Sequence, residues 1–92
     1  MKLSENYMLS EIDGQHVAIP IGQNVADMKK IISLNKTAHY ICELLTSEMT
    51  VEEIIERMCE EYECKGDEEK AMIRHDVLAF TSAATCIGLI VE

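Results

Sequence analysis

The chain has 92 residues, which is enough for one hydrophobic core and too few for two. Its 17 acidic residues outnumber its 8 basic ones, and the formal net charge of −9 argues against broad binding to nucleic acid or to an anionic membrane. No apolar run of signal-peptide length follows Met1, and the longest apolar stretch, CIGLIV at 86–91, is too short to span a bilayer. We therefore expect a cytoplasmic protein.

The N-terminal third predicts a β-hairpin with strands at about 7–12 and 16–21. Asp13-Gly14 is a strong turn signal, because a tight hairpin turn needs positive φ angles that Gly adopts without strain. Pro20 has no N–H for a sheet ladder, so we expect it at a strand end or an edge. The alternation after the turn predicts one buried face, which consists of Val17, Ile19 and Ile21.

A third strand is predicted at about 28–34, where the sequence reads MKKIISL. Met28, Ile32 and Leu34 are expected to face the core, and Ile31 then faces solvent among polar neighbours. The stretch contains no Pro, so it keeps the backbone donors with which an edge strand can pair with another chain.

Three helices are predicted after the strands, at about 36–46, 51–62 and 68–86. Asn35 is a good N-cap for the first helix, and the sequence TVEE at 50–53 is a capping box for the second. Each helix has one apolar stripe, and the three predicted stripes are Ala38, Ile41 and Leu45; Val51, Ile54, Ile55, Met58 and Tyr62; and Ile73, Val77, Phe80 and Ala84.

Strands followed by helices indicate an α+β fold. A three-stranded antiparallel sheet followed by three helices with short turns fits a winged helix-turn-helix-like arrangement of a single domain over residues 1–92. The sequence LIV at 89–91 is either a short closing strand or a tail that packs on the core.

Catalytic and metal sites are not indicated. The four glycines are scattered, and no Ser or Thr has a nucleophile-elbow context. The four cysteines are Cys42, Cys59, Cys64 and Cys86; they form no C-x-x-C pair and have no regular spacing to the histidines, so the signal for zinc is weak. Those at 42, 59 and 86 are expected to be small buried apolar residues of helices. We predict no enzyme activity, cofactor or metal, and a thiol-based metal or redox module is the less favoured alternative.

Five of the eight basic residues fall on two elements that would be neighbours in this fold. Lys29, Lys30 and Lys36 lie in or beside the third strand, and Lys70 and Arg74 lie one turn apart on the third helix. One interpretation is dispersed solubilising charge, because edge strands commonly carry Lys against aggregation. The other is a local basic groove that attracts an acidic ligand. These residues alone leave both interpretations open.

Three segments together carry a resemblance to a known family. They are ISLNKTAHYICELL at 32–45, TVEEIIERMCEEY at 50–62, and the ending DVLAF…GLI at 76–90. In order and spacing they resemble the PqqD-like family, the small peptide chaperones of pyrroloquinoline quinone biosynthesis and their relatives, whose shared unit is called the RiPP recognition element. The similarity covers about Tyr7 to Ile90. Cys42 departs from the large residue that is usual at its position.

The resemblance implies peptide binding without catalysis. In the family, a leader segment of a ribosomally made precursor peptide adds as an extra antiparallel strand to the third strand, in the cleft between that strand and the third helix; this mode is called β-augmentation. A peptide-modifying enzyme is the second implied partner, and a radical SAM enzyme is common beside discrete members. The implied peptide-binding residues are Lys29, Lys30, Ile31, Ile32, Ser33, Leu34, Lys70, Met72, Ile73, Arg74, Asp76, Val77, Ala79 and Ala83.

The orientation of the third helix stays open in the sequence. Its flank with Met72, Asp76 and Ala79 lies opposite the flank with Lys70 and Arg74, and either flank fits beside the third strand. The exposed isoleucine and the two lysines of that strand favour an acidic peptide with an apolar side chain.

Two further alternatives follow from the same elements. An unpaired edge strand also pairs with a second copy of itself, which predicts a homodimer. A winged-helix DNA-binding regulator is the alternative function, and it is less favoured because a recognition helix needs Lys and Arg where this third helix begins GDEEKAMIRHD.

Overall fold

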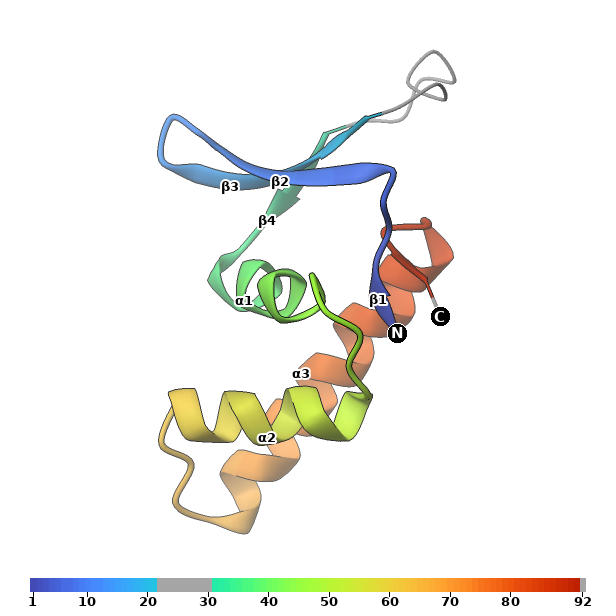
Figure 1. The fold of residues 1–92 in the computed structure, drawn as a ribbon. Helices are drawn as coiled ribbons and strands as arrows, with labels where there is room; N and C mark the ends of the chain where they lie inside the picture. The colour runs from blue at the N-terminus through green and yellow to red at the C-terminus, as the bar shows by residue number, and fades with distance from the viewer. Residues whose placement is uncertain (22–30, 92) are drawn as a thin grey trace.

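The computed structural model describes residues 1–21 and 31–91. Figure 1 shows a sheet on one side of the molecule, α1 beneath it, and α2 and α3 crossing below α1. The elements in chain order are β1 (Lys2–Leu3), β2 (Tyr7–Ile12), β3 (Gln15–Pro20), β4 (Ile32–Leu34), α1 (Lys36–Leu44), α2 (Val51–Glu61), α3 (Asp67–Cys86) and β5 (Ile90–Val91). A three-stranded antiparallel sheet followed by three helices confirms the predicted α+β, winged helix-turn-helix-like fold.

The three-stranded sheet has the order β2-β3-β4, so β4 is one of its outer strands. Asp13 and Gly14 form the turn between β2 and β3 with φ angles of 51° and 80°, the positive values that a tight hairpin turn requires. Pro20 ends β3, as expected of a residue without an N–H. Of the predicted strand at 28–34, residues 28–30 lie outside the described residues, and β4 begins at Ile32.

The face of β3 that packs on the core is the opposite of the predicted one. Ala18 is fully buried in the core cluster, whereas Ile21 is 39% exposed. His16, on the same face as Ala18, stacks on His39 of α1 with 3.7 Å between the ring centroids. The predicted core face was the set Val17, Ile19 and Ile21; Val17 is 5% exposed but lies outside the core cluster, and Ile19 is half-buried. All residues from 17 to 21 are apolar, so alternation does not select a side, and the small Ala18 fits the face against α1.

A second sheet of two short strands joins the chain termini, which Figure 1 shows close together. Leu3 of β1 pairs with Ile90 of β5. The N–H of Leu3 also donates to the C=O of Leu45 over 2.7 Å, and the N–H of Ser4 donates to the C=O of Leu89 over 2.8 Å. The sequence does not predict β1, because a strand of two residues is too short to show an alternation of apolar and polar side chains. The alternatives for 89–91 resolve in favour of a short strand.

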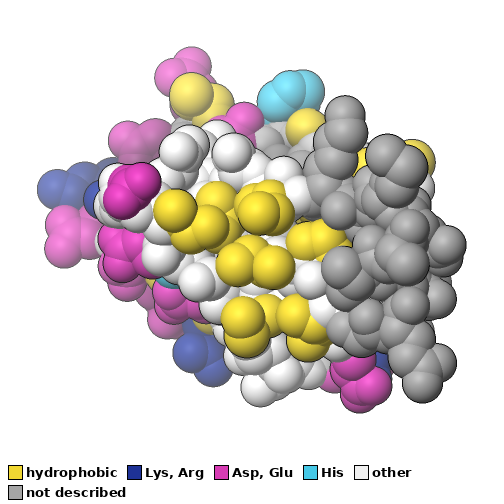
Figure 2. Space-filling model, turned by 90° about the horizontal axis from the view of Figure 1, so that it is seen from above, with side chains coloured by type: hydrophobic (Ala, Val, Ile, Leu, Met, Phe, Trp, Pro, Cys, Tyr) yellow, Lys and Arg dark blue, Asp and Glu magenta, His cyan; other side chains and the backbone are white. Residues whose placement is uncertain are grey.

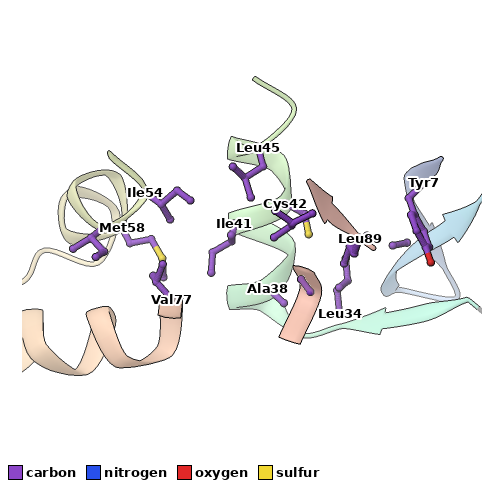
Figure 3. Packing of buried hydrophobic residues seen from close by; sticks show 14 residues of the cluster. Tyr7, Leu34, Ala38, Ile41, Cys42, Leu45, Ile54, Met58, Val77 and Leu89 are labelled. Atoms are coloured by element: carbon purple, nitrogen blue, oxygen red, sulfur yellow. The ribbon is translucent and has the colours of Figure 1, made fainter. Parts of the chain in front are cut away.

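The core lies where the three helices and the sheet meet (Figure 3). The predicted stripe of α1 is buried, and Ile41 and Leu45 have no exposed surface. In α2 the stripe is buried at its centre, but Tyr62 is 39% exposed. Cys42 of α1 has no exposed surface and belongs to the core cluster. Aliphatic residues thus dominate the core.

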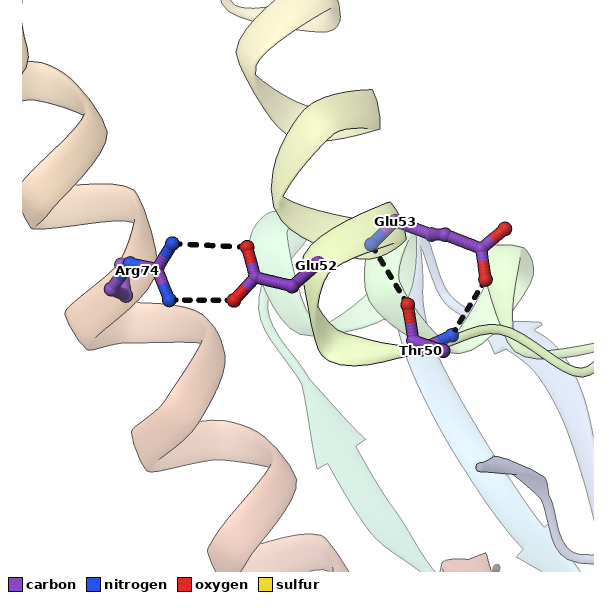
Figure 4. A network of polar contacts seen from close by, with 4 residues as sticks. All are labelled: Thr50, Glu52, Glu53 and Arg74. Carbon is purple, nitrogen blue, oxygen red and sulfur yellow. Dashed lines mark hydrogen bonds and ion pairs between the residues drawn. The ribbon is translucent and has the colours of Figure 1, made fainter.

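The helix caps have the predicted geometry. The side chain of Asn35 accepts a hydrogen bond from the N–H of Ala38 over 2.8 Å. At the start of α2, the N–H of Glu53 donates to the Thr50 hydroxyl over 3.2 Å, and the N–H of Thr50 donates to the Glu53 carboxylate over 3.1 Å (Figure 4). These reciprocal bonds satisfy two of the backbone donors that a helix start leaves without partners.

Substitution of Thr50 by Ala should lower the free energy of unfolding by about 1 kcal/mol, because the helix start loses its side-chain acceptor. Thr50→Ser keeps the hydroxyl and is the matched control, so its stability should stay close to that of the parent. Urea unfolding followed by circular dichroism measures both changes. Equal losses in the two variants would show that the methyl group of Thr50, and not the cap, matters.

Candidate functional site: an open strand edge beside a groove

The outer edge of β4 exposes backbone groups to solvent. Across the two-residue turn, Ile12 and Gln15 form the closing hydrogen-bonded pair of the hairpin, so the odd-numbered residues of β3 bond to β2 and the even-numbered ones face β4. Ile32 and Leu34 therefore bond to β3, since they lie opposite its even residues. The N–H and C=O of Ser33 point the other way, to the edge at which no strand pairs within the described residues.

A groove adjoins this edge and is bordered by the start of α1 and by α3. Its volume is about 440 Å³, and its lining residues are Asn35, Thr37, Ala38, His75, Asp76, Ala79 and Phe80. A second hollow of about 270 Å³ shares Thr37 and Asp76 with it, and extends past Met72 and Ile73 toward Tyr62 and Cys64. The two hollows form a continuous path along one flank of α3.

The structure resolves which flank of α3 faces this path. Met72, Ile73, Asp76 and Ala79 line it. Ala83 is exposed farther along the helix. Val77 does not face the groove, because it is fully buried in the core. On the strand, Ile31 is 54% exposed at the start of the edge and Leu34 is 4% exposed beneath it; Ile32 is half-buried against the core.

Lys70 and Arg74 lie on a different face, where α3 packs on α2. Both line a hollow between these two helices together with acidic residues of α2. The guanidinium of Arg74 donates two hydrogen bonds to the carboxylate of Glu52, over 2.8 and 3.0 Å (Figure 4). The structure therefore does not bring these two cations to the groove beside β4, and the predicted basic groove is not formed by α3. Lys29 and Lys30 lie outside the described residues.

The Glu52–Arg74 pair makes part of the stability depend on pH. The hydrogen bonds and the positive charge of Arg74 lower the pKa of Glu52 below its ordinary value. A lowered folded-state pKa stabilises the fold above the ordinary pKa, and this contribution is lost as the pH falls through the folded pKa. The melting temperature of Glu52→Gln should therefore be slightly below that of the parent at pH 7, and the difference should disappear at acidic pH. A difference that persists unchanged at low pH would contradict this.

Exposed apolar side chains lie on the outer face of the sheet, next to the open edge of β4. Figure 2, seen from the side of the sheet, shows them gathered on one surface. The large exposed ones are Met8, Ile12, Ile21 and Ile31, which are between 39% and 54% exposed. A strand added beside β4 would direct alternate side chains to this face and to the groove at α3, because side chains alternate across a strand.

Several groove residues were not singled out by the sequence as site residues. Thr37, His75 and Phe80 join the groove because α1 starts directly after β4 and crosses α3 there. Asn35 and Ala38 were predicted only as cap and core. The short distance along the chain between the strand end and the helix start is the signal that could have identified them.

Other kinds of site are not evident in the described part of the chain. Among residues 1–21 and 31–91, no three His, Cys, Asp or Glu side chains cluster as metal ligands. Cys86, expected to be buried, is exposed at the end of α3. No helix in these ranges is both long and apolar enough to cross a membrane.

The sheet with its open edge and the groove along α3 define a winged helix-turn-helix-like domain with an unpaired outer strand, β4, within the described residues. The model of the family described as coenzyme PQQ synthesis protein D (PqqD) matches residues 8–90, and the chain belongs to this family. No curated protein matches the sequence. The fold is similar to that of a solved chain described as "TbiB1 in Complex with the TbiA(beta) Leader Peptide", with a TM-score of 0.72 and 22% identity over 97% of this chain and 93% of the other.

Proposed function

We propose that this protein binds the leader segment of a ribosomally made precursor peptide, as an added antiparallel strand on β4, and presents it to a peptide-modifying enzyme. The observation that carries the proposal is the open edge of β4 directly beside the groove on α3. Membership of the PqqD family supports it, as does the leader peptide named in the complex of the similar structure. The protein's own role is binding without catalysis.

In this proposal, the backbone and the side chains have separate tasks. An added strand bonds to the N–H and C=O of Ser33, and these main-chain bonds accept many peptide sequences. Alternate peptide side chains then enter the groove, where Ala79 and Phe80 offer apolar surface. The other peptide side chains lie on the outer sheet face beside Ile31, whose exposed apolar surface they cover.

The charge of the described groove does not favour an acidic peptide. Asp76 lies on both hollows and Glu69 on the second, whereas Lys70 and Arg74 are turned toward α2. The cations of α3 therefore do not support the expectation of an acidic peptide; Lys36 lines a different hollow beside His16 and His39, and Lys29 and Lys30 lie outside the described residues. At the Asp76 end of the groove, a peptide with neutral or cationic side chains is the better electrostatic match.

The proposal is tested by filling the groove. Ala79→Phe places a ring in the space where peptide side chains would enter, and affinity for the peptide should fall about tenfold or more, since displacing such a ring costs about 1–3 kcal/mol. Ala71→Phe is the matched control, because Ala71 is exposed on the same helix but lines the hollow toward α2. The probe is a fluorescent synthetic peptide of the leader region encoded beside this gene, followed by anisotropy. Equal losses in both variants, or none in either, would overturn the groove assignment.

A second copy of the chain is the competing occupant of the edge. Sedimentation velocity with and without the peptide separates the two cases, because both pair with the same backbone groups of β4. If the chain is a dimer that dissociates when the peptide binds, then the peptide and the second copy bind the same edge of β4. A dimer that the peptide leaves intact would place the self-association elsewhere.

Presentation to an enzyme is tested by adding the modifying enzyme encoded nearby, for example a radical SAM enzyme, although no residue of this chain selects that class. The peptide should be modified faster in the presence of this protein, and Ala79→Phe should reduce the gain. DNA binding is not supported, since the first turn of α3 carries Asp67, Glu68 and Glu69 and lacks the cations of a recognition helix.

A further inference from the structure

The end of α2 brings two cysteines together. The chain leaves this helix through Glu63, whose φ of 50° is left-handed, and the N–H of Cys64 donates to the C=O of Cys59 over 3.0 Å. A hydrogen bond from a residue to the carbonyl five positions before it, over a left-handed residue, is the Schellman ending of a helix. A side-chain contact between the two bonded residues frequently accompanies this ending. Here both of them are thiols.

Further observations support contact between the sulfurs. The Cys59 thiol lies close enough to Cys64 to raise the pKa of the Cys64 thiol. Both cysteines are half-buried, unlike the exposed Cys86 and the fully buried Cys42, and both are free thiols. Loss of solvation, with Cys59 as a second cause, raises the pKa of the Cys64 thiol above its ordinary value.

We propose that Cys59 and Cys64 form a reversible intramolecular disulfide that locks the end of α2 to the connection leading into α3. The oxidant is a low-molecular-weight disulfide such as oxidised glutathione. One thiolate attacks it and forms a mixed disulfide, which releases one glutathione thiol. The second cysteine then attacks the mixed disulfide and releases the other, so the protein loses two electrons and two protons and the oxidant gains them.

The position of this pair gives the reaction a structural consequence. Cys64 lines the second hollow along α3, together with Met72 and Asp76, and Cys59 lines the hollow on the α2 side. The disulfide would therefore link the hollow between α2 and α3 to the second hollow along α3. A closed ring this small also reduces the freedom of the unfolded chain, so the oxidised protein should melt at a higher temperature.

The test uses the whole protein in a glutathione redox buffer at pH 8. The expected product has lost two hydrogen atoms in mass, and proteolytic mapping without reduction shows a Cys59–Cys64 link. Cys86→Ser should behave like the parent, whereas Cys59→Ser should acquire only mixed disulfides. Mixed disulfides on both cysteines of the parent, with no internal link, would overturn the proposal.

A trivalent arsenical supplies a measurement that does not depend on oxidation, because it bridges two thiols that lie close together. Phenylarsine oxide should form a one-to-one adduct with the parent and with Cys86→Ser. It should not be retained by Cys59→Ser or Cys64→Ser. An adduct that survives both of these substitutions would place the reactive pair elsewhere. Neither measurement involves peptide binding, so failure of the proposed function would leave this inference standing.

Discussion

Ser33→Pro should weaken peptide binding by about tenfold to one hundredfold while leaving the fold intact. The proline removes the N–H that points to the open edge, so one peptide carbonyl is left without its donor when the strand docks; an unsatisfied buried group costs about 1–3 kcal/mol, and each 1.4 kcal/mol is tenfold in affinity. The bonds between β4 and β3 are made by Ile32 and Leu34 and are not touched. Anisotropy with the labelled leader peptide measures the loss.

Ser33→Ala is the matched control, because it removes the hydroxyl and keeps the backbone donor. Its affinity should stay close to that of the parent, and circular dichroism should show that both variants are folded. If the two variants bind equally well, then the peptide does not pair with this edge.

Chemical change of the peptide tests the same edge without altering the protein. In an antiparallel strand, every second residue directs its N–H to the neighbour and the residues between direct theirs away. Leader peptides that carry a single N-methyl group should therefore lose affinity at alternate positions only. A uniform loss, or no loss at any position, would contradict strand addition on β4.

The sequence was sufficient for the fold because its strongest signals are local. The Asp13-Gly14 turn, the Asn35 cap and the capping box at Thr50 each depend on a few adjacent residues, and each has the predicted geometry. In α1 and α2, the apolar residues that recur at helical spacing are mostly the ones that are buried. Where turn and cap residues agree with the periodicity, the secondary structure can be predicted without knowledge of tertiary contacts.

The sequence was insufficient where a choice depends on a distant partner. The core face of β3 was predicted on the wrong side, because a run of apolar residues has no polar side and the approach of α1 to Ala18 decides. The flank of α3 was open for the same reason. The ion pair of Arg74 with Glu52, which are 22 positions apart, settles it, and no pattern within α3 contains that information.

The candidate site also has one part that the sequence predicts and one part that it does not. The exposed Ile31 and the donors of the edge strand were readable from MKKIISL, since alternation and the lack of Pro are local properties. The groove could not be predicted from the sequence, because its walls come from the cap residue Asn35, the start of α1 and the middle of α3. Small residues such as Ala79 carry no chemical signal of their own, and only their place between larger neighbours gives them a role.

Ile41→Ala should lower the free energy of unfolding by about 3–4 kcal/mol, within the range of about 2–5 measured for such core truncations. Ile41 has no exposed surface, and Figure 3 shows it on the side of α1 that faces α2 and α3. A domain of this size has about 5–15 kcal/mol in total, so the loss is a large fraction of the whole. The melting temperature should fall by roughly 4–8 °C for each kcal/mol.

Ile31→Ala is the matched control, because it deletes the same atoms from a side chain that is 54% exposed at the strand edge. Its stability should change by less than about 1 kcal/mol, since a surface position leaves no cavity. When peptide affinity is measured below the melting transition, Ile31→Ala should have the larger effect of the two variants. Ile31→Ala loses apolar contact with the added strand and binds more weakly, whereas folded Ile41→Ala presents an unchanged edge and binds as the parent does. If Ile31→Ala affects stability and not affinity, then Ile31 belongs to the fold and the peptide lies elsewhere.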